Sequence, residues 1–171
     1  MTDTDRTTAA AADPIHRHLR TREELREGML DLIRSARGEL LVAAPALDAS
    51  LFSGSELGSA IAHLLTRRSA NRVRIVVEDT EHMLATSTRI VELARRLSDM
   101  LLIRRLGEVH HGMDEMFMVA DRKGCLAQHD VNTIDATLDL GAPRLATPFA
   151  LRFEELWNAA EPVPGLHSFR L

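Results

Sequence analysis

Three short apolar-rich runs, separated by amphipathic helical patterns, constrain the fold of this chain more than any other feature. The runs are ELLVAAP (39–45), RVRIVVE (72–78) and MLLIRRL (100–106). Apolar runs of strand length are typical of strands that are buried on both faces, as in a parallel sheet. Helices that alternate with such strands indicate βαβ units. We therefore predict an α/β fold with a mostly parallel mixed sheet, flanked by helices and joined by right-handed crossovers.

The helical patterns between these runs carry recognisable start signals. Thr21 and Glu24 have the spacing of a capping box, in which a hydroxyl and a carboxylate satisfy free backbone N–H groups at a helix start. Ser53 and Glu56 repeat that spacing and predict a second capped helix. An apolar stripe predicts a third helix over about residues 84–98.

After the third apolar run the pattern changes to a late β-hairpin, a further strand and a C-terminal helix. Residues 115–128 predict two strands joined by a turn at Asp-Arg-Lys-Gly (121–124). The alternating segment TIDATLDL (133–140) predicts a half-exposed strand. The last helix is predicted to begin near Pro143 or at Pro148, because proline favours the first position of a helix.

The length of the chain and its first residues indicate how the protein is divided into domain and tail. With 171 residues the chain is long enough to bury a core, and we expect one domain over residues 21–171. Residues 1–20 are predicted to be a flexible N-terminal tail, because their start lacks the apolar core of a secretory signal. No apolar run approaches the roughly 20 residues that span a membrane. The one cysteine, Cys125, is predicted to be a buried, inert thiol, which fits a reducing cytoplasm.

The net charge of the chain argues against nucleic acid as a partner. The formal net charge is −4, whereas strong, indiscriminate nucleic-acid binding needs a basic surface. Lys123 is the only lysine, tyrosine is absent, and this arginine bias is typical of a GC-rich bacterial genome. The arginine pairs are therefore interpreted, together with Arg72 and Arg74, as a solvated surface with ion pairs. These pairs stand at 67–68, 95–96 and 104–105.

The order of the predicted elements resembles one half of a phospholipase D-like enzyme. The stretches that carry the resemblance are DEMFMVADRKGC (114–125) and RFEELW (152–157). In that superfamily a late strand carries H-x-K-x-x-x-x-D. The resemblance implies a histidine that attacks phosphorus, a lysine that holds phosphate oxygens and an aspartate that supports the site.

The catalytic positions of that motif are occupied by other residues in this chain. Asp114 takes the histidine position, Met116 takes the lysine position and Asp121 takes the aspartate position. The superfamily often has a Gly-Ser-x-Asn segment after the hairpin, and only Asn132 matches it here. A carboxylate cannot form the phosphoramidate bond that the histidine forms. A methionine removes the cation that offsets charge in the transition state. We therefore expect a degenerate active site without phospholipase D chemistry.

The segment from about residue 21 to residue 171 further resembles a bacterial family of degenerate phospholipase D-like domains. Its members occur alone or attached to acetyltransferase domains of the GNAT type. The matching segments are LLVAAPALDASLF, RVRIVVED, RIVELARRL, EMFMVADRKG and FEELW. That family has no established activity, so the resemblance implies a fold and not a reaction.

Four residues are candidates for a crevice at the carboxyl edge of the sheet. Asp48 and Asp79 each follow a predicted parallel strand, at the edge where open α/β sheets bind ligands. Both are also good helix caps, and capping is the role that we favour. His129 and Asp130 follow the hairpin and would approach the same edge.

His110 and His111, close to Asp114 and Glu115, are of metal-ligand type. Adjacent histidines on a loop point in different directions, and neither H-x-x-x-H on a helix nor paired C-x-x-C is present. We therefore interpret this segment as a solvated loop and expect no metal site and no cofactor.

These observations favour a non-catalytic binding or accessory module. Active relatives assemble one site from two halves, so a single half-sized copy implies a homodimer. One alternative is a repurposed hydrolase or phosphodiesterase-like enzyme that uses Asp114, His129 and Asp130 in the remaining crevice. Another is an accessory subunit of an acetyltransferase, which only the domain neighbours of the family suggest. No membrane partner is expected.

Overall fold

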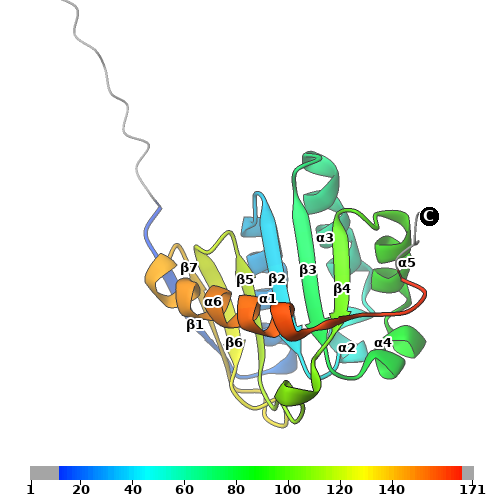
Figure 1. The fold of residues 1–171 in the computed structure, drawn as a ribbon. Helices are drawn as coiled ribbons and strands as arrows, with labels where there is room; N and C mark the ends of the chain where they lie inside the picture. Colours follow the sequence, from blue (N-terminus) through cyan, green and yellow to red (C-terminus); the bar gives the residue numbers. More distant parts are fainter. Residues whose placement is uncertain (1–11, 167–171) are drawn as a thin grey trace, which may run out of the picture.

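A computed structural model of the chain describes residues 12–166 and contains one eight-stranded sheet flanked by helices (Figure 1). In chain order the elements are β1 (Ile15–Leu19), α1 (Arg22–Ser35), β2 (Glu39–Ala44), α2 (Ala49–Phe52), α3 (Ser55–Arg67), β3 (Arg72–Val77), α4 (Thr80–Thr86), α5 (Thr88–Arg96), β4 (Leu101–Arg105), the 3-10 helix η1 (Glu108–His110), β5 (Met116–Ala120), β6 (Gly124–Gln128), β7 (Ala136–Leu140), α6 (Pro143–Ala159) and β8 (Glu161–Pro162). The predicted α/β class, with its late hairpin and C-terminal helix, is confirmed.

The strand order is β1-β7-β6-β5-β2-β3-β4-β8. Only the central β2, β3 and β4 are parallel to one another, and each of the other neighbouring pairs is antiparallel. The parallel part is smaller than expected because β5, β6 and β7 follow one another through short connections. A short connection joins antiparallel strands, whereas parallel neighbours need a crossover.

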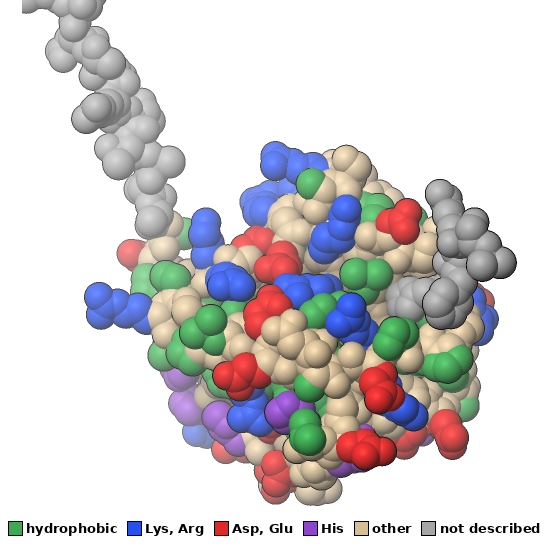
Figure 2. All heavy atoms as spheres, in the orientation of Figure 1, with side chains coloured by type: hydrophobic (Ala, Val, Ile, Leu, Met, Phe, Trp, Pro, Cys, Tyr) green, Lys and Arg blue, Asp and Glu red, His purple; other side chains and the backbone are tan. Residues whose placement is uncertain are grey.

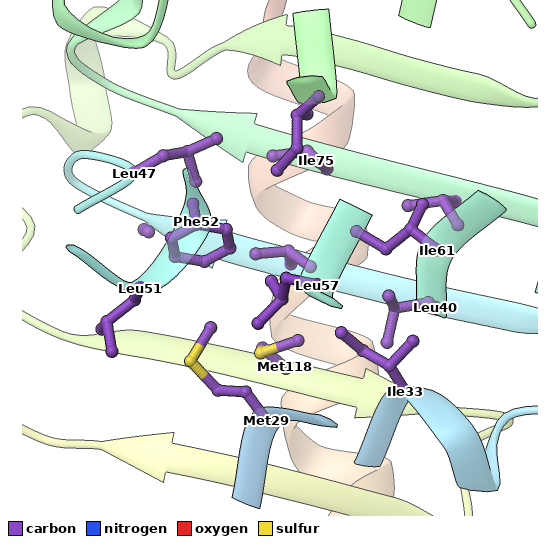
Figure 3. Packing of buried hydrophobic residues seen from close by; sticks show 14 of the residues in the cluster. Met29, Ile33, Leu40, Leu47, Leu51, Phe52, Leu57, Ile61, Ile75 and Met118 are labelled. Carbon is purple, nitrogen blue, oxygen red and sulfur yellow. The ribbon is translucent and has the colours of Figure 1, made fainter. Parts of the chain in front are cut away.

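The two faces of the sheet are covered unequally. Helix α6 lies alone across one face, while α1 to α5 cover the other (Figure 1). Figure 3 shows the larger core on the second face, where side chains of α1 and α3 meet those of the central strands. Met29 and Ile33 of α1 are directed toward Leu57 of α3, above Leu40 of β2 and Met118 of β5. A smaller core lies between α6 and the opposite face.

One predicted capping box is confirmed and the other is wrong. The Thr21 hydroxyl accepts the N–H of Glu24 at 3.1 Å, and the Glu24 carboxylate accepts the N–H of Thr21 at 3.2 Å. Helix α3 instead has Gly54 as its N-cap, with no side-chain hydrogen bond. Ser53 ends the short helix α2, and its hydroxyl donates to the carbonyl of Ala49. Its hydroxyl is therefore already used by the preceding helix.

The predicted helix over about 84–98 is two helices, α4 and α5, that meet at Ser87. Ser87 is buried and has a non-helical backbone, with φ −96° and ψ 47°. The run Thr86-Ser87-Thr88 places three residues of low helix propensity at this point. The Thr86 hydroxyl donates to the carbonyl of His82 at 2.8 Å.

The turn between β5 and β6 is held by the side chain of its first residue. Asp121 and Arg122 have φ of 51° and 55°, and a type I′ turn requires positive φ at both central residues. The Asp121 carboxylate accepts the backbone N–H groups of Arg37, Gly38 and Glu39 at 2.6, 2.9 and 2.8 Å. The turn is thereby fixed to the start of β2.

The start of α6 decides between the two predicted prolines. The helix begins at Pro143, and Pro148 lies inside it without a backbone N–H to donate. The buried residues of the helix share one face, which is the face that packs on the sheet. They are Ala146, Ala150, Phe153, Leu156 and Trp157.

The predicted boundary of the N-terminal tail at residue 20 is wrong. Residues Ile15–Leu19 form β1, which pairs antiparallel with β7 at one edge of the sheet. The segment IHRHL lacks an apolar stripe because β1 buries only Leu19. Residues 1–11 of the predicted tail and residues 167–171 of the predicted domain lie outside the described residues. In residues 12–166, no helix has the length and apolar character that would let it cross a membrane.

Candidate functional site

A cavity of about 600 Å³ opens at the edge of the sheet where β2 ends and β5 begins. The antiparallel pairing of β2 and β5 brings the loop after β2 to the same edge as the end of β6. Its apolar lining consists of Leu25, Pro45, Ala46, Ala49, Leu51, Phe52, Met116, Val131 and Ile134. Its polar lining consists of Arg22, Asp48, His82, Gln128, Asn132 and Thr133.

Two paired residues line the sheet side of this cavity. Met116 of β5 lies opposite Gln128 of β6, so their side chains point to the same face of the sheet. Both are buried, at 3% and 6% exposure. The Gln128 amide nitrogen donates to the carbonyl of Thr133 at 2.5 Å. The Gln128 amide therefore stands in the lining beside an apolar thioether, and its oxygen is of hydrogen-bond acceptor type.

The charged groups of the cavity neutralise each other. Arg22 of α1 lies 3.1 Å from the Asp48 carboxylate and also donates to the Ser50 hydroxyl. Asp48 caps α2 by accepting the N–H of Ser50 at 2.8 Å. Partial burial raises the pKa of Asp48, but the hydrogen bonds from Ser50 and Arg22 together hold it below its usual value. Asp48 is therefore ionised at neutral pH and offsets the charge of Arg22.

The predicted capping role of Asp48 and Asp79 is confirmed. Asp79 caps α4 by accepting the N–H of His82 at 2.9 Å. Asp48 lines the cavity, whereas Asp79 is not among its lining residues. The two carboxylates therefore do not share this crevice.

The positions aligned with the phospholipase D motif are divided between the two ends of β5. Met116 and Asn132 line the cavity. Asp121 lies beyond the far end of the strand, and five residues of strand span roughly 17 Å. Asp114 is exposed and contacts the neighbouring loop through its carbonyl, which accepts the N–H of Val131 at 2.7 Å. Asp121 has the structural role in the turn described above.

The other candidate crevice residues, His129 and Asp130, lie outside the cavity lining. Asp130 forms a local turn in which its carboxylate accepts the backbone N–H of Asn132 at 2.8 Å and the side-chain amide of Asn132 at 2.9 Å. His129 is exposed. The structure does not bring these two residues and Asp114 together around the cavity.

His110 and His111 lie in and just after η1. The His111 ring lies 3.2 Å from the carbonyl of Leu106, and the nearby carboxylate of Glu115 is paired with Arg152. In the part of the chain that the structure describes, no three His, Cys, Asp or Glu side chains are grouped so that they would hold a metal ion.

Several lining residues were missed by the sequence analysis, and Arg22, Phe52 and Gln128 are the main ones. Gln128 could have been recognised from the sequence, because it is the one polar side chain of the buried strand GCLAQ. Nothing in the sequence distinguishes Arg22 or Phe52 as a lining residue, since an arginine in a first helical turn and a phenylalanine in a short helix are common features. Their convergence depends on how α1 and α2 pack.

Comparisons with known proteins place the chain in a family and show solved structures of similar fold. Residues 21–169 match the family model described as Domain of unknown function (DUF7931). No curated protein matches the sequence. Nuc from Salmonella typhimurium, a phospholipase D family member, is similar in structure, with a TM-score of 0.68 at 16% identity over 88% of this chain and 99% of Nuc.

Two further solved structures support the same fold. NucT from Helicobacter pylori has a TM-score of 0.65 at 14% identity and is covered over 100% of its length by 88% of this chain. TrmBL2, an archaeal chromatin protein described as showing a novel mode of DNA binding, has a TM-score of 0.64 at 17% identity over 87% of this chain and 55% of TrmBL2. The chain thus belongs to the DUF7931 family and has the fold of the phospholipase D family.

Proposed function

We propose that this phospholipase D-like domain is a non-catalytic module that binds a small ligand in the cavity beside β5. One observation carries the proposal: Met116, at the position aligned with the phosphate-holding lysine, is a buried apolar lining residue of that cavity. Where an active relative would present a cation to phosphate, this chain presents a thioether.

The electrostatics of the cavity support the absence of phosphodiester cleavage. Cleavage builds negative charge on the phosphoryl oxygens, and fixed cations must offset that charge in the transition state. The guanidinium in the lining, Arg22, is already paired with Asp48 and Ser50. A phosphodiester entering the cavity would compete with Asp48 for Arg22.

The lining supports a ligand with an apolar body and one hydrogen-bond donor. Ligand pockets are commonly about 300–1,000 Å³, mostly apolar, with a few convergent polar groups. Nine apolar residues line this cavity, and the amide of Gln128, whose oxygen can accept a hydrogen bond, stands beside Met116. An uncharged aromatic or aliphatic molecule with an N–H or O–H group fits this arrangement.

A binding experiment with N-phenyl-1-naphthylamine tests the proposal, because this uncharged probe has two aromatic parts and one N–H donor. We expect a saturable rise in its fluorescence with the wild-type chain. The variant Val131→Asp places a charge in the lining and is expected to weaken binding at least about tenfold. The control Val109→Asp changes a valine of 83% exposure outside the lining and should leave binding unchanged. Equal affinities of the two variants would contradict the proposal.

A phosphodiesterase assay separates the module from the repurposed enzyme. We expect hydrolysis of bis(p-nitrophenyl) phosphate to stay at the buffer level for the wild-type chain. Asp114→Ala and His129→Ala should leave probe binding unchanged, because neither residue lines the cavity. Hydrolysis above background that either substitution abolishes would instead support the enzyme with Asp114, His129 and Asp130.

The proposed partners are a second copy of the chain and an acetyltransferase. The resemblance supports a homodimer and, through the neighbours of related domains, an acetyltransferase partner; native mass and co-purification test these. The net charge of −4 supports a module without nucleic acid, although TrmBL2 is described as a DNA-binding protein. The buried thiol Cys125 supports a reducing compartment such as the cytoplasm.

A further inference from the structure

The edge strand β1 carries two histidines that point to the same side of the sheet. His16 and His18 are two residues apart on a strand, so their side chains share one face. Their Nε2 atoms lie 3.4 Å apart, and the rings are perpendicular with centroids 5.0 Å apart. Figure 2 shows histidine side chains exposed at the side of the α6 face on which β1 and β7 lie. Two ring nitrogens therefore converge at the surface.

The separation of these nitrogens matches that of two ligands on one tetrahedral metal ion. Zinc binds histidine nitrogen at about 2.0–2.1 Å in tetrahedral geometry, which places two ligand nitrogens about 3.3–3.4 Å apart. The two Nε2 atoms therefore already have the separation that one such ion requires.

A buried carboxylate fixes the orientation of the first ring. Asp139 of β7 lies directly opposite His16, is 7% exposed, and has its Oδ1 atom 2.5 Å from Nδ1 of His16. A carboxylate in this position accepts the Nδ1–H, which leaves the lone pair of the His16 Nε2 atom directed toward His18. Histidines that bind metal ions usually donate their second ring N–H to such a carboxylate, which orients the ring and strengthens the ligand.

We propose that His16 and His18 form a binding site for a divalent transition-metal ion of the zinc and copper class, with Asp139 as the positioning residue of His16. Imidazole nitrogens suit zinc, copper and nickel, whereas magnesium prefers oxygen ligands. Water completes the coordination, because the His16 side chain is 56% exposed and β1 is the outermost strand of its edge. This site lies apart from the cavity beside β5 and does not depend on its function.

Calorimetric titration of the untagged, full-length chain with ZnCl₂ tests the proposal. We expect one zinc ion per chain, with an affinity that His16→Ala and His18→Ala each weaken more than about tenfold. Asp139→Asn keeps both imidazoles and should weaken zinc binding about 10- to 100-fold, the range found for residues that orient metal ligands. The absorption spectrum of bound CoCl₂ should show tetrahedral nitrogen coordination and should be lost in His18→Ala.

Matched variants separate this site from other histidines. His63→Ala removes an exposed histidine of α3 and should leave zinc binding unchanged. The double variant His110→Ala/His111→Ala should likewise bind zinc as the wild type does. Loss of binding in that double variant but not in His16→Ala would overturn the proposal. So would binding of MgCl₂ with the affinity of ZnCl₂.

Discussion

Arg74 of β3 donates two hydrogen bonds to the carboxylate of Glu154 on α6, at 3.0 and 2.6 Å. The same guanidinium donates to Glu39 at 2.9 Å and lies over the rings of Phe153 and Trp157, 5.2 and 5.4 Å from their centroids. Only 17% of the Arg74 side chain is exposed. The interpretation of Arg74 as part of a solvated surface is therefore wrong, although its ion pairs are present. This contact holds α6 on the sheet.

Glu154→Gln should destabilise the protein by about 1.5 kcal/mol, because it weakens the charged hydrogen bonds with Arg74. This value is the lower end of the range for hydrogen bonds to charged groups, and we choose it because the Glu154 side chain is 31% exposed. Urea unfolding at pH 7 measures the loss. Glu155→Gln is the matched control, because Glu155 is exposed on the same helix and should change stability by less than about 0.5 kcal/mol. Equal losses in the two variants would show that the pair with Arg74 contributes nothing.

The contribution of Glu154 should depend on pH in a defined direction. The hydrogen bond from Arg74 holds the pKa of Glu154 below its ordinary value of 4.5, against partial burial, which raises it. A depressed carboxyl pKa stabilises the folded state fully above the unfolded pKa, and this stabilisation is lost as pH falls through the folded pKa. The difference between wild type and Glu154→Gln should therefore be constant above pH 4.5 and shrink below it. A difference that grows on acidification would contradict this assignment.

Asp121→Ala should destabilise the fold by about 2–4 kcal/mol, because the backbone N–H groups of Arg37, Gly38 and Glu39 lose a charged acceptor. Asp121→Asn should cost less, because asparagine tolerates the positive φ of the turn and keeps one acceptor oxygen. Thermal unfolding compares the variants with Asp135→Ala, which removes an exposed aspartate near β7. If Asp121→Ala were as stable as Asp135→Ala, the carboxylate would not hold the turn.

Asp48 allows the helix cap and the ion pair to be measured separately. Asp48→Ala removes both and should cost about 0.5–2 kcal/mol, the usual effect of losing an N-cap. Asp48→Asn keeps an acceptor for the N–H of Ser50 and loses only the pair with Arg22. Since both side chains of that pair are about half exposed, the loss should stay below about 1 kcal/mol. Equal destabilisation by both substitutions, measured in urea, would assign the whole effect to the ion pair.

Cys125 should react slowly with thiol reagents in the folded protein. Burial, with a smaller contribution from the charge of Asp139, raises its pKa from 9.0 to about 11. At pH 8 this leaves roughly a hundredfold less thiolate than an ordinary cysteine carries, and the thiolate is the reactive form. Ellman's reagent should therefore modify the thiol at a normal rate only in denaturant. Rapid modification of the native chain would contradict this assignment.

Local sequence signals predicted the repeating elements well, because those elements depend on neighbours along the chain. The capping box of Thr21 and Glu24 and the strand start at Glu39 need only residues within one or two turns. The same reasoning failed at Ser53, whose hydroxyl donates within α2, and at β1, whose central three residues are polar. In both places a neighbouring element decided the outcome.

The sequence by itself determined the α/β order, the late hairpin and the apolar residue at position 116, since periodicity and residue type are properties of the chain alone. The tertiary structure decided which side chains meet. Pairing of β5 with β6 puts Met116 beside Gln128, and pairing of β1 with β7 puts His16 against Asp139, 123 residues away. Such contacts depend on strand register and helix packing, which join residues that carry no mutual signal along the chain.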